Sequence, residues 1–327
     1  MLFTGADQLT ALMKILDGKG SGTAVCINPG TLDKKFQNAQ NEPDIHTRDQ
    51  ATDKGDQVFI KSGAKWYAAK KIESGGRIRY TKDTSSNISY DNEQIVAYLR
   101  NAYYQIDEDI DLNMARFNGI GGSSTSSAFS GVIIGNKEQI PTITLTGTPK
   151  TGATGGLVRY SQGSVIKNLI VNINGVTVTD MSGTDKFFGG VIGYVIGGDN
   201  IIDNVAVNAN GSGLTIENDD AKLLPVGGYV GLVGGADCKK GGGVIFRNMA
   251  PQPGFTSVNT KNGSEPVNTE ASEYYYWNPY VGRVLDGFAC SEKGTSLNNT
   301  DKNYTIPMLN PEQKLSISAK YGTDTVK

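Results

Sequence analysis

Hydrophobic and polar residues alternate along two stretches of the chain. In residues 169–174 (LIVNIN), Leu169, Val171 and Ile173 fall on one face, while asparagines dominate the other. Residues 205–210 (VAVNAN) repeat this pattern. A period of two predicts half-buried β-strands, and no amphipathic helix separates the stretches, so the pattern argues against a doubly wound α/β fold.

Two segments nearer the N-terminus have the period of a helix. Residues 7–18 (DQLTALMKILDG) place their leucines and Met13 on one side and stop at Gly18. A second, short helix begins at Asp91, which can cap it together with Gln94, three residues on. We expect this second helix to cover the open edge of the sheet that follows it.

A seven-residue phrase occurs four times, at residues 155–161 (GGLVRYS), 189–195 (GGVIGYV), 227–233 (GGYVGLV) and 278–284 (NPYVGRV). A second phrase follows the first three, and its shared asparagines are Asn168, Asn204 and Asn248. Spacings of this size are typical of stacked supersecondary units. The repeats therefore predict an all-β fold, a solenoid of parallel strands or β-helix, with glycine pairs at sharp corners or close backbone approaches and the asparagines stacked as an amide ladder.

The repeats also predict how the chain is divided. Residues 89–300 form the parallel β-helix with its short capping helix, and residues 301–327 form a C-terminal tail. Residues 1–88 form a small α+β region that includes strand-like runs at 58–60 and 65–68. We expect this region to pack on the first repeat, although a separate domain is the alternative.

Charge and composition limit the kinds of partner that this chain is expected to bind. Lys and Arg total 31 and Asp and Glu 33, for a formal net charge of −2, so no strong field favours nucleic acid or an anionic membrane. No run approaches the roughly 18–20 apolar residues of a membrane span. Cys26, Cys238 and Cys290 form no CxxC pair. A disulfide bond between Cys238 and Cys290 is one interpretation. The other is that these cysteines are small, buried apolar residues.

Several segments resemble bacterial GLUG-repeat cell-surface proteins. Residues 104–112 (YQIDEDIDL), 117–121 (FNGIG) and 128–131 (AFSG) are similar to the segment that leads into those repeats. The phrases GGLVRY, GGVIGYV and GGYVGLVGG are similar to the glycine-rich core of the repeat itself. The resemblance covers roughly residues 89–290 and implies a right-handed β-helix in a large secreted or wall-attached protein, of a kind often classed with adhesins. It implies no particular ligand.

The chain departs from that pattern in three respects. Arg159 replaces the central glycine of the first phrase, Pro279 stands in the last phrase, and the sequence shows neither a secretion signal nor a wall-sorting motif. We therefore expect the chain to be a segment of a longer parent protein that is extracellular or attached to the cell wall.

Three aspartates are a candidate cation site. Asp107, Asp109 and Asp111 would share one face if they lie on a strand, and carboxylate oxygens are the ligands that Ca²⁺ prefers. The EF-hand pattern fails, because Leu112 occupies the glycine position. Solvated surface charges or turn acceptors are the alternative, and no other cofactor is expected.

The densest aromatic cluster is Tyr274, Tyr275, Tyr276 and Trp277. Adjacent rings of this kind can form a stacking platform for a glycan. The alternative is that alternate rings pack on the last repeats. For Trp66 and Tyr67, too, the alternatives are a sugar-stacking surface and packing in the core.

Catalytic signals are sparse. The lone histidine, His46, has no nucleophile motif near it. Two carboxylate pairs, Asp199/Asp203 and Asp219/Asp220, could serve a polysaccharide hydrolase or lyase, although turn chemistry explains the first pair equally well.

These observations predict a noncatalytic segment of a bacterial surface protein, a rigid stalk that displays loops for adhesion to a glycan or a host protein. A carbohydrate-active enzyme on a β-helix is the alternative, and a purely structural repeat is a third reading.

Overall fold

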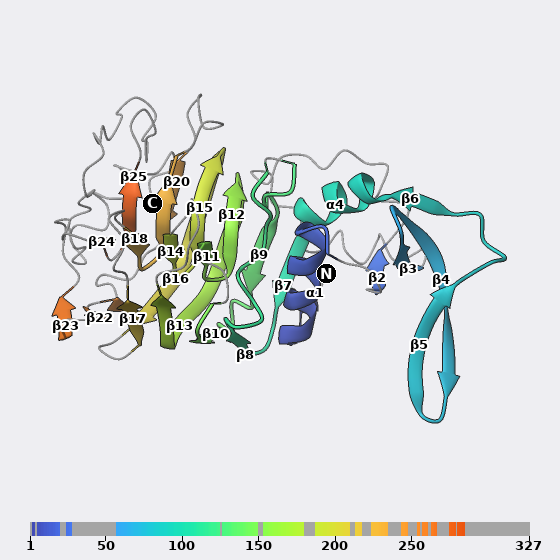
Figure 1. Ribbon diagram of the computed structural model, residues 1–327, viewed down its shortest axis with the longest axis horizontal. Coiled ribbons are helices and arrows are strands. Elements are labelled where there is room, and N and C mark those ends of the chain that lie inside the picture. Colours follow the sequence, from blue (N-terminus) through green and yellow to red (C-terminus); the bar gives the residue numbers. More distant parts are fainter. Residues whose placement is uncertain are drawn as a thin grey trace.

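The computed structural model describes residues 2–3, 5–19, 24–27, 57–124, 126–149, 153–179, 187–209, 213–217, 224–234, 243–247, 254–255, 257–260, 263–266, 275–278 and 280–284. Strands predominate over these ranges, which contain two helices, α1 (Ala6–Leu16) and α4 (Asn92–Arg100). Figure 1 shows the strands from β7 to β25 side by side, with both helices at one end of the row. The predicted all-β class is confirmed at this level.

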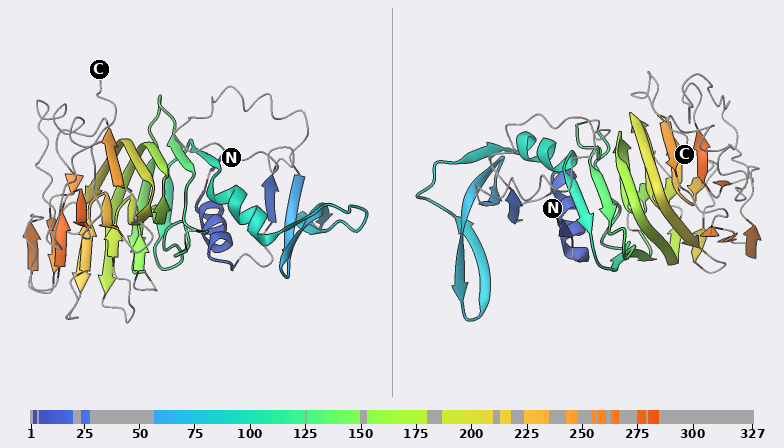
Figure 2. Two further views of the ribbon diagram at one scale, coloured as in Figure 1. Left: turned by 90° about the horizontal axis from the view of Figure 1, so that it is seen from above. Right: turned by 180° about the vertical axis from the view of Figure 1, so that it is seen from behind.

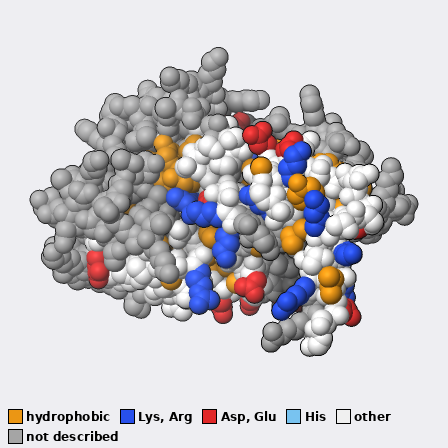
Figure 3. All heavy atoms as spheres, turned by 45° about the vertical axis from the view of Figure 1, so that its right-hand side comes forward, with side chains coloured by type: hydrophobic (Ala, Val, Ile, Leu, Met, Phe, Trp, Pro, Cys, Tyr) orange, Lys and Arg blue, Asp and Glu red, His pale blue; other side chains and the backbone are white. Residues whose placement is uncertain are grey.

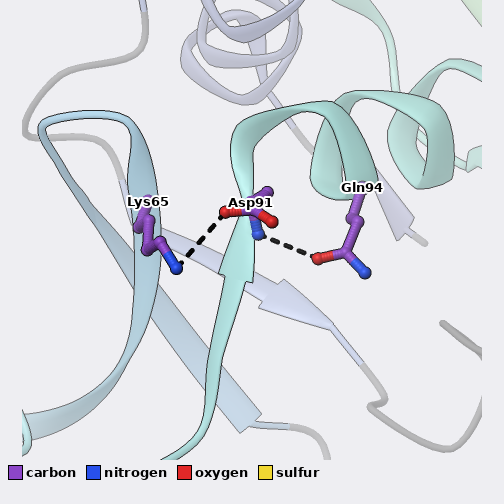
Figure 4. A network of polar contacts seen from close by, with 3 residues as sticks. All are labelled: Lys65, Asp91 and Gln94. Atoms are coloured by element: carbon purple, nitrogen blue, oxygen red, sulfur yellow. Dashed lines mark hydrogen bonds and ion pairs between the residues drawn. The ribbon is translucent and has the colours of Figure 1, made fainter.

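Both predicted helices form. Helix α4 begins after Asp91, whose backbone N–H donates a hydrogen bond of 2.9 Å to Gln94 Oε1, as the predicted cap requires (Figure 4). Lys65 Nζ lies 3.5 Å from Asp91 Oδ1, on the other side of the same residue (Figure 4). The cap thus joins α4 to the strand that contains Lys65.

Two four-stranded parallel sheets contain the glycine-led phrases. One consists of β11 (Ala153–Gly155), β14 (Phe187–Gly189), β18 (Leu224–Gly227) and β24 (Tyr275–Asn278). The other consists of β12 (Val158–Gln162), β15 (Ile192–Gly197), β19 (Val230–Val233) and β25 (Val281–Val284).

The register of these sheets matches the alignment of the four phrases. Gly155 pairs with Gly189, Gly189 with Gly227, and Gly227 with Asn278. None of the glycines in the pairs at 155–156, 189–190 and 227–228 has a positive φ. The close approach of neighbouring backbones, rather than a left-handed conformation, therefore explains why these positions need glycine.

A 12-stranded sheet contains the second phrase. Its strands are β1 (Leu2–Phe3), β7 (Tyr103–Ile106), β8 (Ile110–Asn113), β9 (Val132–Gly135), β10 (Thr142–Gly147), β13 (Val165–Thr179), β16 (Asp199–Ala209), β17 (Leu214–Glu217), β20 (Gly243–Arg247), β21 (Gly254–Phe255), β22 (Ser257–Thr260) and β23 (Gly263–Pro266). Among its described pairings, β22–β23 is antiparallel and the others are parallel.

The core lies between these sheets. Leu169, Val171 and Ile173 of β13 are at most 1% exposed, and they pair in register or lie in line with buried residues of β16. Each such side chain contributes about 1.5–3 kcal/mol through burial. Alternation along β13 and β16 was therefore predicted correctly. One asparagine of the expected polar face, Asn168, is instead 4% exposed, because the chain turns a corner there.

The N-terminal region contains a five-stranded antiparallel sheet that stands apart from the parallel strands (Figure 2). Its strands are β2 (Ala24–Ile27), β3 (Gln57–Ser62), β4 (Lys65–Ser74), β5 (Arg77–Lys82) and β6 (Ser89–Asp91). Trp66 is fully buried, and its Nε1 donates to Asn92 Oδ1 at 3.1 Å. The interpretation that Trp66 packs in the core is thus confirmed.

Helix α1 and strand β1 lie against the parallel strands. β1 pairs with β7, and the buried leucines of α1 belong to the same hydrophobic core as Leu112 and Phe117. Both helices therefore cover the N-terminal end of the parallel strands; the sequence analysis assigned this cover to the second helix and expected residues 1–88, which contain α1, to pack on the first repeat.

Arg159 attaches α1 to the first phrase. Its Nη1 lies 3.8 Å from Asp17 Oδ2, and the two side chains are 19% and 14% exposed. Burial raises the pKa of Asp17 and outweighs the opposing attraction of Arg159. The arginine that departs from the repeat pattern thus makes a contact at the end of the stack, where terminal repeats are typically atypical.

Candidate functional site

The predicted aromatic platform falls on a paired strand. Tyr274 lies outside the described residues, while Tyr275, Tyr276 and Trp277 belong to β24. The backbone of this strand pairs in parallel with β18, where Val226 is the partner of Trp277. Glycan stacking on this cluster stays a prediction.

The three aspartates do not share a strand face. Asp107 and Asp109 lie in the turn between β7 and β8, and only Asp111 lies in a strand. Asp107 Oδ1 accepts a hydrogen bond of 2.7 Å from Gln105 Nε2, and Asp109 Oδ1 accepts one of 2.7 Å from the Thr142 N–H. The strand assumed for a Ca²⁺ site was therefore wrong, and these two carboxylates act as acceptors at the turn.

The first candidate catalytic pair is divided between two environments. Asp203 is 7% exposed, and its Oδ2 lies 3.3 Å from Lys167 Nζ, its register partner in β13. Arg247 is the register partner of Asp203 on the other side, in β20. Asp199 is exposed at the start of β16. An acid whose register neighbours on both sides are cations is typical of a cross-strand pair that holds strands together, and the ion pair of Asp203 with Lys167 joins β16 to β13.

Other candidate residues lie outside the described residues, namely Asp219, Asp220, His46, Cys238, Cys290 and Asn248. Within the described ranges, no three His, Cys, Asp or Glu side chains gather closely enough to hold a metal ion. Neither of the two described helices has the length and apolar character that crossing a membrane requires.

The asparagine ladder forms between the two members that the structure describes. Asn204 Nδ2 donates to Asn168 Oδ1 at 2.9 Å. Both residues have left-handed backbones, with φ of 54° at Asn168 and 51° at Asn204, a conformation that asparagine tolerates better than most residues. These positions therefore require asparagine both for the corner and for the bond between repeats.

The ladder ends at Asn168. Its Nδ2 is buried and has no hydrogen-bond partner, and the preceding repeat presents Gly135 at this level, where a Cβ would lie 1.9 Å from Asn168 O. No side chain fits at this position, so the row of stacked amides ends at Asn168 on the side of the preceding repeat.

Replacing Asn204 with alanine or with glycine separates the loss of the hydrogen bond between repeats from the strain of the left-handed backbone. We expect Asn204→Ala to lower the free energy of unfolding by about 2–3 kcal/mol, because it loses the bond to Asn168 and strains a left-handed backbone. Asn204→Gly should lower it by only about 1 kcal/mol, because glycine adopts a positive φ without strain. Urea denaturation of both variants measures the difference, and equal losses would show that the corner conformation is unimportant.

A second polar cluster was not anticipated from the sequence. Asn200 is fully buried, and its Oδ1 accepts hydrogen bonds from Ser161 Oγ at 2.5 Å, the Gly163 N–H at 3.0 Å and the Ser164 N–H at 3.1 Å. Its Nδ2 lies 3.1 Å from Gly197 O, 3.0 Å from Gly198 O and 3.2 Å from Gly243 O.

This single amide thus joins the corner turns of three successive repeats. The signal that could have found it is the sequence Gly197-Gly198-Asp199-Asn200, a turn that precedes a strand, aligned with Gln162-Gly163-Ser164 one repeat earlier. The arrangement is structural, since the described partners of the Asn200 side chain are backbone groups and two buried serines.

Asn168, Asn200 and Asn204 therefore stabilise corners and join repeats. Comparisons with models of protein families, with curated proteins and with solved structures found no match to this chain.

Proposed function

We propose that this chain is a noncatalytic, β-helical segment of a bacterial surface protein, a rigid stalk that displays loops for adhesion to a glycan or a host protein. The observation that carries the proposal is the register, since each glycine-led phrase pairs in parallel with the next one along the chain. Repeats that stack in this way form long, stiff bodies, because each one contacts mainly its neighbours.

The order of the strands supports a helical path. One repeat passes through β11, β12 and β13, the next through β14, β15 and β16, and the next through β18, β19 and β20. Each strand pairs with its counterpart in the following repeat. Repeated passage through the same three sheets in the same order is what a β-helix requires and supports that fold, and the resemblance to GLUG-repeat proteins favours the right-handed form and a cell-surface location.

The environment of the candidate acids supports a role without catalysis. A glycosidase needs two carboxyl groups that flank one sugar bond. Asp203 is almost fully buried against Lys167, whereas Asp199 is exposed at the start of the same strand. Asp203 is therefore better suited to joining β13 and β16 than to reaching a substrate.

The test is turnover of polysaccharides. The purified chain, with and without Ca²⁺, is incubated at high concentration with a panel of host and bacterial polysaccharides, and new reducing ends and unsaturated uronates are measured. We expect no product above a heat-denatured control. Product that disappears in an Asp199→Asn variant would contradict the stalk and assign the chain to carbohydrate-active enzymes.

A further inference from the structure

The β4–β5 hairpin projects from the antiparallel sheet. Residues Lys65–Tyr67 of β4 pair with β3 and β6, whereas Ala69–Ser74 pair only with β5. The hairpin extends beyond the remainder of its sheet as a two-stranded ribbon (Figures 1 and 2). Residues 70–76 are all exposed. Residues 70–76 are thus accessible on both faces of the ribbon.

This part of the chain concentrates positive charge. Residues 57–91 contain seven Lys and Arg, namely Lys61, Lys65, Lys70, Lys71, Arg77, Arg79 and Lys82, against three acids, Glu73, Asp83 and Asp91. The charges of the whole chain nearly cancel, with 31 basic and 33 acidic residues. This small net charge therefore conceals an excess of positive charge in residues 57–91. Figure 3 shows Lys and Arg side chains at several places on one side of the molecule, with Asp and Glu side chains among them.

The local acids do not remove these cations from solvent. Lys71 pairs with Glu73, but the two side chains are 49% and 65% exposed, and exposed pairs of this kind are weak and exchange readily. Lys65 and Asp91 are exposed to a similar degree. Asp83 accepts hydrogen bonds from the Ser85 hydroxyl at 2.6 Å and its N–H at 3.0 Å, which lower the pKa of Asp83.

Each face of the ribbon presents cations. Lys70 is opposite Thr81 and Arg79 is opposite Ile72, so Lys70 and Arg79 are diagonal neighbours on one face. The other face carries Lys71, opposite Tyr80, and Lys82, whose Nζ lies 3.7 Å from the centre of the Tyr67 ring.

We propose that the β4–β5 ribbon binds an acidic polysaccharide, a linear chain of sugars that carries carboxylate or sulfate groups. The proposal rests on the function proposed above and specifies its glycan. The cations follow the length of the ribbon, whereas its tip is Ser74-Gly75-Gly76, so a linear polyanion fits better than a flat membrane, which would meet the tip first. Tyr67 and Tyr80, both partly exposed, lie beside the cations and supply rings on which a sugar can stack.

The test compares two triple variants of the full chain. Lys70→Gln, Lys71→Gln and Arg79→Gln remove charge from the ribbon, whereas Lys14→Gln, Arg116→Gln and Lys137→Gln remove the same charge from exposed positions elsewhere. Binding of heparin, polygalacturonate and neutral dextran is measured by isothermal titration calorimetry at low and high salt. We expect the chain to bind one of the acidic polymers but not dextran, and the ribbon variant to bind it at least about tenfold more weakly than the control variant. Added salt should weaken binding further.

Three results would overturn the proposal. The first is equal binding by the two triple variants, and the second is tighter binding to single-stranded DNA or to anionic vesicles than to either acidic polymer. The third is self-association of the ribbon variant with unchanged binding, which would show that the lysines protect an exposed strand edge. Failure here leaves the stalk intact, because polysaccharide turnover tests the stalk separately.

Discussion

Replacing Gly156 with alanine is expected to lower the free energy of unfolding by at least about 3 kcal/mol, because no space exists for a methyl group between two repeats. The Gly156 N–H donates to Gly189 O at 2.5 Å, and a Cβ on Gly156 would lie 1.5 Å from Gly190 O. Both obstructing groups are backbone, so relief requires the two repeats to separate. Guanidinium denaturation followed by circular dichroism measures the loss.

Gly5→Ala is the matched control. Gly5 precedes α1 with an extended backbone, and nothing lies within 4 Å of a Cβ built there. Because glycine is better than alanine at an N-cap, we expect this variant to lower the free energy of unfolding by no more than about 1 kcal/mol. A Gly156→Ala protein as stable as Gly5→Ala would mean that the repeats do not pack backbone to backbone, and the stacked arrangement itself would be in doubt.

The second large effect is expected at Asn200. Asn200→Ala should lower the free energy of unfolding by about 3–5 kcal/mol, because it removes the acceptor of the buried Ser164 N–H and the partly buried Gly163 N–H and the donor to the buried Gly197 and Gly243 carbonyl groups. Thermal and urea denaturation measure this loss, and hydrogen exchange should show faster exchange at residues 163–164.

Two further variants define the cause. Asn208→Ala, in the same strand but exposed, should change stability by no more than about 0.5 kcal/mol. Asn200→Asp retains the acceptor but loses the amide donors and buries a carboxylate, so it should also be strongly destabilising. If Asn200→Ala behaved like Asn208→Ala, the buried amide would not be holding the three repeats together.

The parallel strands were predictable because repetition in the sequence reports contact in space. Gly155, Gly189 and Gly227 align in the sequence, and they pair in the structure. Helix α4 was predictable because Asp91 and Gln94 form a local signal that needs no tertiary context.

The candidate sites were less predictable, because side-chain environment depends on distant segments. Asp107 and Asp109 alternate as a strand would, yet the chain turns between them, and Asp109 bonds to the N–H of Thr142 in another strand. Asp203 is an acid of the type that glycosidases use, but its carboxylate pairs with Lys167 of the preceding repeat. Neither partner is visible in the local sequence.

For the molecule as a whole, the repeated phrases and their apolar alternation were sufficient to specify strand-rich, parallel pairing and its register, since like residues bury one another when repeats stack. Only the tertiary structure decided that Asn200 joins three corners, that Arg159 reaches Asp17 at the end of α1, and that five of the seven cations of residues 57–91 lie on one projecting ribbon. Each of these depends on segments brought together by folding, and a balanced net charge carries no information about where the charges lie.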